Sequence, residues 1–160
     1  MEILPLEKKD ISAVWEINQQ GLPGTGEVTH QEVEGLLGFA SFAVGIFDLE
    51  ELLGFVICMP PRTQYASLNY SWFNERYDSF VYVDRIAVSE QHRNKNIGTR
   101  LYDYVVEAAM NINAPIAAEV SLKPPNPGSM RFHSRFQFEE VGVLHHDSKS
   151  VTMLIRPADS

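Results

Sequence analysis

Apolar and polar positions along the chain follow two periods, one typical of helices and the other typical of strands. Asp10 stands where a helix cap is expected, directly before an apolar face that contains Ile11, Val14 and Ile17. The glycine- and proline-containing segment 21–26 then ends this helix. The pattern therefore predicts an amphipathic helix early in the chain.

The same two periods divide the rest of the chain into strands and helices. Short apolar runs predict seven strands, over residues 2–6, 41–47, 52–59, 80–88, 116–122, 138–144 and 150–155. Stripes with helical spacing predict three further helices, over residues 30–37, 98–112 and 127–136. A hairpin followed by strand, helix, strand, helix and strand predicts an α/β protein with a mixed sheet.

Length and composition limit the architecture and the surroundings. The 160 residues predict a single domain, residues 1–160, and 44% hydrophobic residues with 21% charged residues are typical of a globular chain. No stretch approaches the roughly 20 apolar residues that a membrane helix needs, and the N-terminus is charged too early for a signal peptide. We therefore expect a soluble, cytoplasmic protein with no membrane partner.

Charge and cysteine content exclude several classes of function. A net charge of −8 argues against a broad nucleic-acid surface, because such surfaces neutralise phosphates. The only cysteine, Cys58, excludes an intramolecular disulfide and a multi-thiolate zinc site, and no metal site is predicted. With no basic neighbour to lower its pKa, Cys58 is interpreted as a buried core residue.

A local basic cluster follows the predicted strand 80–88. Arg93, Lys95 and Arg100 place three of the chain's 13 lysine and arginine residues within eight positions. Because this loop leads into a predicted helix, it also presents free backbone N–H groups and the positive end of the helix dipole. The pattern predicts a site for a phosphate-bearing small molecule, with a solvated basic turn as the alternative.

Two segments resemble known motifs. Residues 93–101 resemble the acyl-coenzyme A pyrophosphate loop of the GNAT acetyltransferase superfamily, with Asn96 at the usual first glycine. Residues 126–138 resemble the later helix of that superfamily, with His133 in place of the usual tyrosine. The resemblance extends from residue 2 to residue 155 and implies a single-domain fold with a mixed, mostly antiparallel sheet flanked by helices. Residues 82–86 further resemble a bacterial subgroup without an assigned substrate.

The resemblance also implies a reaction and a set of contacts. It implies direct acetyl transfer from acetyl-CoA to an amine in a ternary complex. The implied partners of the pantetheine arm are Ile86, Ala87, Val88, Asn126 and Ser129. The implied cradle of the pyrophosphate consists of Arg93, Asn94, Lys95, Asn96, Ile97, Gly98 and Thr99. Helix capping by Asn126 and core packing by Ile86 and Val88 are alternative interpretations.

An acetyl transfer to an amine needs a base, and two carboxylates are candidates. Asp84 and Glu119 each lie inside an otherwise apolar predicted strand, where a charge is costly to bury unless it is paired or used. Side chains alternate along a strand, so Arg85 is expected on the face opposite Asp84. Asp84 or Glu119 is thus predicted to be the base or an amine-binding group, with a structural salt bridge as the alternative.

The substitution of His133 for tyrosine suggests a second catalytic role. By the resemblance, His133 would supply a proton or a hydrogen bond to the departing coenzyme A sulfur, either as imidazolium or as a neutral N–H donor. A pH profile with a descending limb is expected only if the imidazolium is required. The alternative is an exposed helix residue without a role in the reaction.

Six of the 17 aromatic residues fall within residues 65–80. The segment is predicted to be a long loop that folds over the acceptor, with Tyr70 and Trp72 as substrate contacts. A satellite core and a dimer surface are equally compatible with this composition, so a homodimer is left open.

The sequence therefore predicts an N-acetyltransferase acting on a small amine or amino-acid-like acceptor. Two alternatives stay open, a non-catalytic sensor of coenzyme A with the same fold and an acetyltransferase for protein N-termini.

Overall fold

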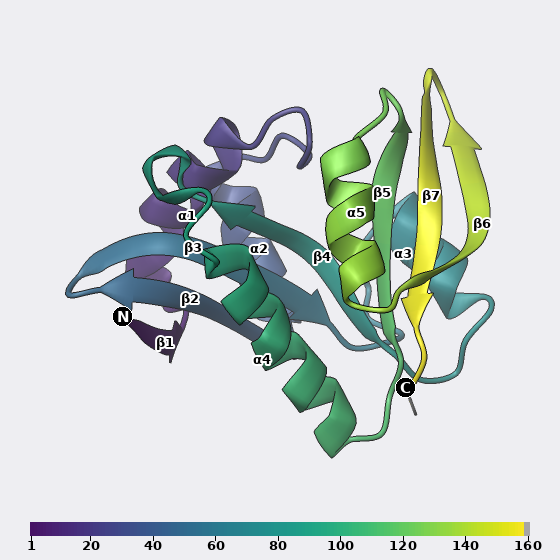
Figure 1. Cartoon of the computed structure of the whole chain (residues 1–160), viewed down its shortest axis with the longest axis horizontal. Coiled ribbons are helices and arrows are strands. Elements are labelled where there is room, and N and C mark those ends of the chain that lie inside the picture. Colours follow the sequence, from purple (N-terminus) through teal and green to yellow (C-terminus); the bar gives the residue numbers. More distant parts are fainter. Residues whose placement is uncertain (159–160) are drawn as a thin grey trace.

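Seven strands form one continuous sheet in this computed structural model, which describes residues 1–158 (Figure 1). They are β1 (Glu2–Pro5), β2 (Phe42–Asp48), β3 (Glu51–Met59), β4 (Val81–Val88), β5 (Ile116–Lys123), β6 (Glu139–His146) and β7 (Lys149–Arg156). Their order across the sheet is β1-β2-β3-β4-β5-β7-β6. Only β4 and β5 are parallel neighbours, so the predicted α/β class with a mixed, mostly antiparallel sheet is confirmed.

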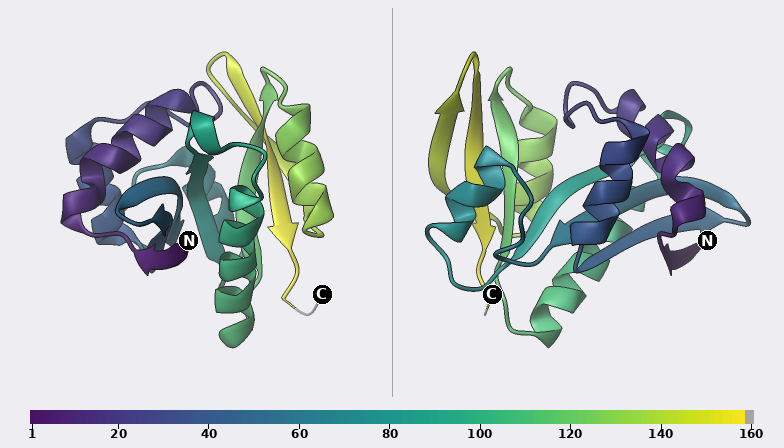
Figure 2. Two further views of the ribbon diagram at one scale, coloured as in Figure 1. Left: turned by 60° about the vertical axis from the view of Figure 1, so that its left-hand side comes forward. Right: turned by 180° about the vertical axis from the view of Figure 1, so that it is seen from behind.

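Helices cover both faces of this sheet. They are α1 (Ile11–Gln20), α2 (His30–Phe39), α3 (Leu68–Asn74), α4 (Ile97–Asn111) and α5 (Pro127–Arg135). Helices α4 and α5 lie on one face, and α1, α2 and α3 lie on the opposite face (Figures 1 and 2). Among residues 1–158, no helix is both long and apolar enough to cross a membrane.

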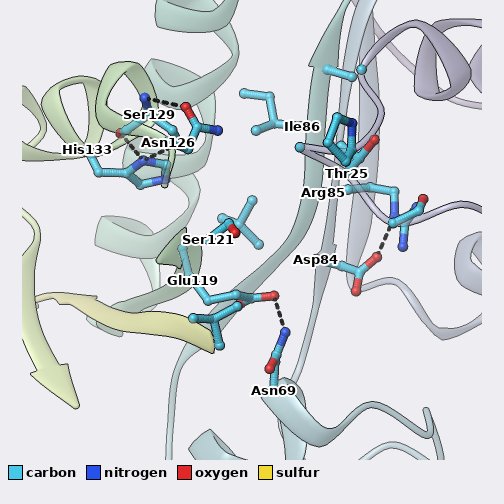
Figure 3. A pocket seen from close by; sticks show the side chains of 18 of the residues that line it. Thr25, Asn69, Asp84, Arg85, Ile86, Glu119, Ser121, Asn126, Ser129 and His133 are labelled. Atoms are coloured by element: carbon cyan, nitrogen blue, oxygen red, sulfur yellow. Dashed lines mark hydrogen bonds and ion pairs between the residues drawn. The ribbon is translucent and has the colours of Figure 1, made fainter. Parts of the chain in front are cut away.

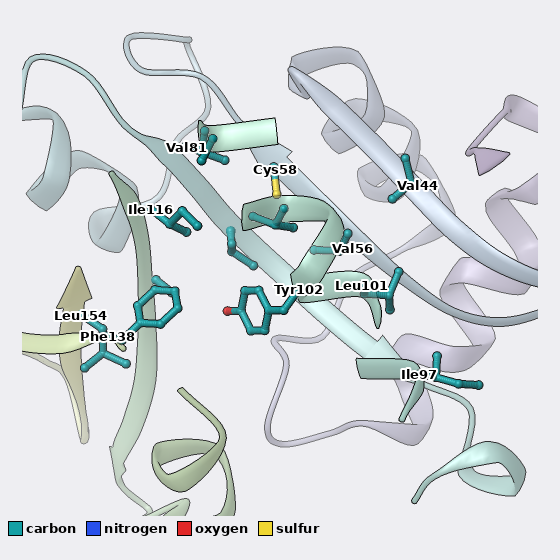
Figure 4. Close-up of a cluster of buried hydrophobic side chains, with 14 of the residues drawn as sticks. Val44, Val56, Cys58, Val81, Ile97, Leu101, Tyr102, Ile116, Phe138 and Leu154 are labelled. Atoms are coloured by element: carbon teal, nitrogen blue, oxygen red, sulfur yellow. The ribbon is translucent and has the colours of Figure 1, made fainter. Parts of the chain in front are cut away.

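The hydrophobic core is correspondingly divided into two clusters, one on each face of the sheet. Figure 4 shows the cluster beneath α4, where Leu101 and Tyr102 of that helix pack on strand residues that include Val56. Cys58 is fully buried in this cluster, as predicted, and burial raises the pKa of its thiol. The thiol is therefore a core group rather than a nucleophile.

The aromatic segment 65–80 is not the long loop that the sequence predicts, because it contains α3. Ser67 caps this helix by accepting a hydrogen bond from the backbone N–H of Tyr70. Tyr70 and Phe73, three residues apart, both point into the core and are fully buried. Their burial outweighs the weak helix propensity of aromatic residues, which is why the local pattern failed to indicate this short helix.

The parallel pairing of β4 and β5 at the centre of the sheet is short, so the two strands separate over the rest of their length. Strands β4 and β5 are paired only at Val81 with Ile116 and at Tyr82 with Ala117. Beyond Tyr82 the two strands part, as Figure 1 shows. The β4 edge that faces β5 thus has no strand partner over the rest of its length within the described chain. Its backbone polar groups there are available to an extended ligand.

A bulge in β4 changes which side chains share a face. Arg85 pairs with Ile57 of β3, whereas the next pair in the ladder joins Val83 to Cys58. Asp84 is therefore the extra residue, and alternation is interrupted at this point. The prediction that Asp84 and Arg85 point to opposite faces is wrong, because the bulge brings both side chains to the same side.

Close packing also fixes the start of α4 beside β4. A Cβ atom at Gly54 of β3 would lie 2.9 Å from Cγ2 of Ile97 and 3.0 Å from the carbonyl oxygen of Ala87. Only glycine leaves room for the first turn of α4 to pack this closely on β3. The N-terminus of α4 is thereby held next to the open edge of β4.

Candidate active site

A cavity of about 680 Å³ lies where β4 and β5 part (Figure 3). Its lining comes from α4 and α5 on one face of the sheet and from the α1–α2 loop, residues 65–69 and the β6–β7 hairpin on the other. The cavity therefore passes through the sheet and can be reached by one ligand from each face.

On the α4 side, the loop that precedes α4 has the geometry of an anion site. Asn96, at the helix N-cap, has a positive φ of 62°, and Asn94 has a φ of 65°. The side chain of Asn96 makes no capping hydrogen bond within the described chain. The first N–H groups of α4 are thus left for a ligand, and the helix dipole favours a negative charge there.

A smaller cavity of about 220 Å³ adjoins this helix terminus. Six of the seven predicted cradle residues line it: Arg93, Asn94, Asn96, Ile97, Gly98 and Thr99. The seventh, Lys95, is exposed and lies outside the lining. Arg135, in the last turn of α5, adds a cationic side chain that could not be singled out from the sequence.

The guanidinium of Arg93 is held between two elements. Its Nη2 donates to the carbonyl oxygen of Gln20 at the end of α1 over 3.1 Å, and its Nε donates to that of Val88 over 3.4 Å. Arg93 nevertheless lines both cavities. Arg93 therefore places a positive charge between the two cavities. It also links the end of α1 to the end of β4.

Residues of β4 and α5 form two walls of the larger cavity. Ile86, Ala87 and Val88 line it from β4, and Asn126 and Ser129 line it from α5 (Figure 3). The Asn126 side chain also caps α5, because it accepts a hydrogen bond from the Ser129 N–H over 3.2 Å. The capping interpretation is thus confirmed, and it is compatible with a place in the cavity wall.

On the opposite face, Glu119 of β5 points into the cavity. Its Oε1 accepts hydrogen bonds from the Tyr82 hydroxyl at 2.8 Å and from the Asn69 amide at 3.1 Å. Its Oε2 is buried and has no partner among the described residues. Burial raises the pKa of Glu119 to about 8, against the lowering effect of the hydrogen bond from Tyr82. Such a carboxylate can accept a proton near neutral pH.

Asp84 has a different environment, because both of its oxygens have partners. Oδ2 accepts from the Arg85 Nε at 2.8 Å, and Oδ1 accepts from the Tyr65 hydroxyl at 2.6 Å. The Arg85 Nη1 in turn donates to the Asn18 side chain and to the Gly26 carbonyl oxygen, each at 3.1 Å. Asp84 is thus part of a nearly buried ion pair that fastens the α1–α2 loop beside the cavity.

His133 is buried, with an exposed fraction of 5%, which excludes the interpretation as an exposed helix residue. Its Nδ1 lies 2.8 Å from the carbonyl oxygen of Ser129, and its Nε2 lies 2.6 Å from the Tyr102 hydroxyl. A carbonyl oxygen only accepts, so Nδ1 carries the proton. Burial lowers the pKa of His133, so the ring is neutral and its Nε2 accepts a hydrogen bond from the Tyr102 hydroxyl.

The two aromatic residues predicted to contact the substrate lie outside the cavity lining. Tyr70 is fully buried, and its hydroxyl donates to the carbonyl oxygen of Pro60. Trp72 packs against Gly142 of β6, where a Cβ atom would lie 2.6 Å from the indole. Both residues serve packing. Their segment reaches the cavity instead through Tyr65, Ser67 and Asn69.

Comparison with known proteins gives the family. The sequence model of the acetyltransferase (GNAT) family matches residues 11–138. No curated protein matches the sequence.

Solved structures with the same fold come from several organisms. The ribosomal-protein-S18-alanine N-acetyltransferase from Escherichia coli has a TM-score of 0.76 at 13% identity, covering 99% of this chain and 94% of that chain. Ard1 from Thermoplasma volcanium has a TM-score of 0.77 at 19% identity, covering 97% and 95%. Arabidopsis thaliana NAA60 in complex with acetyl-CoA has a TM-score of 0.75 at 19% identity, covering 96% and 97%.

At these identities the structural likeness establishes the fold alone, whereas the family match spans most of the chain. The family match covers residues 11–138. Two features of the fold are consistent with it: the separation of β4 from β5 and the uncapped N-terminus of α4. The chain therefore belongs to the acetyltransferase (GNAT) family and is an acyltransferase whose acetyl donor is acetyl-CoA.

Proposed function

We propose that this protein is an N-acetyltransferase that acetylates a small amine or amino-acid-like acceptor by direct attack in a ternary complex. The observation that supports this most is the cavity through the sheet. It joins the uncapped N-terminus of α4 on one face to the buried carboxyl group of Glu119 on the other.

The residues on the α4 side fit acetyl-CoA, which supplies an acetyl thioester and a thiolate leaving group. Backbone N–H groups of residues 94–99 hold the pyrophosphate, and Arg93 and Lys95 add charge. The open edge of β4 at residues 86–88 pairs with the amides of the pantetheine arm, and Asn126 and Ser129 face the arm from α5.

Glu119 is the base in this proposal. An alkylamine with a pKa of about 10 is neutral in only about one molecule in a thousand at pH 7, so its proton has to be removed. Oε2 of Glu119 is free to take that proton directly or through water, whereas both oxygens of Asp84 are already engaged. Because the pKa of Glu119 is about 8, the ionised fraction and therefore turnover rise as the pH approaches 8.

A protein N-terminus is a second candidate acceptor. The similar structures include a ribosomal-protein-S18-alanine N-acetyltransferase. The α1–α2 loop and the β6–β7 hairpin also line the cavity, and we expect a chain end to enter between them. A peptide with a free α-amine therefore belongs in the acceptor screen.

The test is release of thiol from acetyl-CoA in the presence of a pool of amines, amino acids and short peptides. We expect thiol release above the rate without acceptor, together with an acetylated amine detected by mass spectrometry. Glu119→Gln should lower turnover about a hundredfold or more, because it removes the base. Its affinity for coenzyme A, measured by calorimetry, should stay within about twofold of the wild-type value.

Two outcomes would contradict the proposal. Binding of acetyl-CoA without thiol release for any member of the pool would favour the non-catalytic sensor. Wild-type turnover in Glu119→Gln would remove Glu119 from the reaction. The same measurement on Asp84→Asn would then show whether Asp84 is the base.

A further inference from the structure

The β6–β7 hairpin forms a wall of the cavity on the face that carries Glu119. His146, the last residue of β6, is paired with Lys149, the first residue of β7. Directly opposed residues of two strands project to the same face of a sheet, and both of these residues line the cavity. The hairpin thus brings an imidazole and an ammonium group to one end of the acceptor region.

His146 has a buried ring nitrogen without a hydrogen-bond partner, and Lys149 is an exposed lysine without an ion-pair partner among the described residues. The ring nitrogen without a partner is Nε2. A buried polar atom without a partner is costly, and an occupant of the cavity would remove that cost.

The other charged groups on this face leave the ammonium of Lys149 unbalanced. The carboxylate of Asp84 is neutralised by Arg85 at 2.8 Å. Glu119 has a pKa of about 8 and is therefore mostly uncharged at pH 7. The charged residues that line the cavity are Arg85, Arg93, Lys149, Asp84 and Glu119, so the lining keeps a positive balance even when Glu119 is ionised as the base. This balance favours a ligand that carries a negative charge.

We propose that the acceptor carries, besides its amine, a carboxylate or phosphate group that binds to Lys149 and His146. This inference rests on the proposed acetylation of an amine at Glu119, and it names the acceptor as an anionic amine. The ammonium group of Lys149 supplies the charge, and Nε2 of His146 supplies a hydrogen bond to the anionic group.

The strand register gives an approximate length for this acceptor. Glu119 of β5 lies opposite Met153 of β7, and Lys149 lies four residues from Met153 along the same strand. At about 3.3 Å per residue, this separation is about 13 Å between backbone positions. The side chains of Glu119 and Lys149 bridge part of this distance, because both residues line the cavity. An ω-amino acid, a phosphorylated amine or a dipeptide with an acidic second residue has a length that fits the rest.

The experiment compares acceptors that differ only in charge. Acetylation by the wild-type protein is measured for 6-aminohexanoate against 6-aminohexanamide and for alanylglutamate against alanylglutamine, both dipeptides with an amidated C-terminus. We expect kcat/KM to be at least about tenfold higher for the acid in at least one pair. The pair that shows the preference distinguishes a free ω-amino acid from a peptide as the source of the anionic group.

Substitutions of Lys149 test whether this residue causes the preference for the acid over the amide. Lys149→Ala should reduce the ratio of kcat/KM for acid over amide about tenfold, Lys149→Glu should invert the preference, and Lys149→Arg should retain it. Lys123→Ala is the matched control, because Lys123 is an exposed lysine at the end of β5 that does not line the cavity. Its acid-to-amide ratio should equal that of the wild type.

Failure of this inference is distinguishable from failure of the proposed function. If other amines in the pool are acetylated but neither acid exceeds its amide, the inference is overturned and the proposed function stands. An equal acid-to-amide ratio in Lys149→Ala and the wild type also overturns it. If no amine at all is acetylated, the proposed function fails, and the inference fails with it.

Discussion

Glu119 combines features that usually exclude each other in a folded protein. It is an acidic side chain whose Oε2 is buried, and only its Oε1 has hydrogen-bond partners within the described chain. Burial of this group makes ionisation costly and so raises its pKa to about 8. The same property that suits Glu119 to accept a proton therefore makes it a source of instability at alkaline pH.

We predict a pH-dependent difference in stability between the wild type and Glu119→Gln. Between pH 4.5, the ordinary pKa, and about pH 8, the folded state holds a proton that the unfolded state has lost. The free energy of unfolding of the wild type therefore falls, relative to the variant, as the pH rises through this window. The difference changes by at most about 1.4 kcal/mol for each pH unit and levels off above pH 8. Urea denaturation at several pH values measures it, and a constant difference would contradict the prediction.

His133 offers a second prediction at this scale. Both ring nitrogens already have partners, and the lowered pKa leaves little imidazolium at neutral pH. We therefore expect turnover to rise with pH without a descending limb that reports the imidazolium of His133. A bell-shaped profile that becomes a simple rise in His133→Gln would show instead that the imidazolium is required.

The hydrogen bond between Tyr102 and His133 should also be visible in stability. His133→Phe leaves the buried Tyr102 hydroxyl without its acceptor, which should lower the free energy of unfolding by about 1–3 kcal/mol. Tyr102→Phe in the same background should recover part of that loss, because it removes the unpartnered hydroxyl. Strict additivity of the two substitutions in a double-mutant cycle would indicate that the two side chains are not coupled.

At the scale of elements, the N-terminus of α4 depends on a backbone conformation that few residues adopt. Asn96 has a φ of 62°, in the left-handed region that favours glycine. Asn96→Gly should keep or improve the affinity for coenzyme A, because glycine adopts this conformation without strain. Asn96→Val should weaken binding about tenfold or more, since a β-branched residue resists a positive φ. Calorimetry with coenzyme A gives both values, and equal affinities for the two variants would contradict the geometric argument.

Most elements could be predicted from the sequence because their periodicity is long and regular. All seven strands and four of the five helices follow from it, and Asp84 and Glu119 could be singled out as carboxylates in apolar strands. Helix α3 could not, because seven residues give too short a pattern and its aromatic residues serve packing.

Features that depend on contacts between distant segments could not be predicted from the sequence. The pairing of Asp84 with Arg85 follows from a bulge that alternation does not encode. Tyr102 could be placed in a helix, but its contact with His133, 31 positions away, exists only in the folded molecule. Residues 65–69 likewise line the cavity only because the fold brings them next to it, which their local pattern does not indicate.

At the scale of the whole molecule, one arrangement relates the fold to the reaction. The sheet is continuous at one end of the β4–β5 pair and open at the other, so the cavity connects the two helix-covered faces. Arg85 and Arg93 bind the α1 helix and its following loop to β4 and to the segment after it, beside this opening. The opening is therefore framed by rigid strands and by a loop that β4 itself holds in place.

The parting of β4 and β5 also has a consequence for steady-state kinetics. In the proposed reaction the two substrates approach from opposite faces, so neither has to leave before the other enters, and no acetylated form of the enzyme is needed. Double-reciprocal plots of initial rate against one substrate, at several fixed concentrations of the other, should intersect. Free coenzyme A should compete with acetyl-CoA but not with the amine. A family of parallel lines would mean that the acetyl group rests on the protein between two half-reactions, and the opening through the sheet would then serve one substrate at a time.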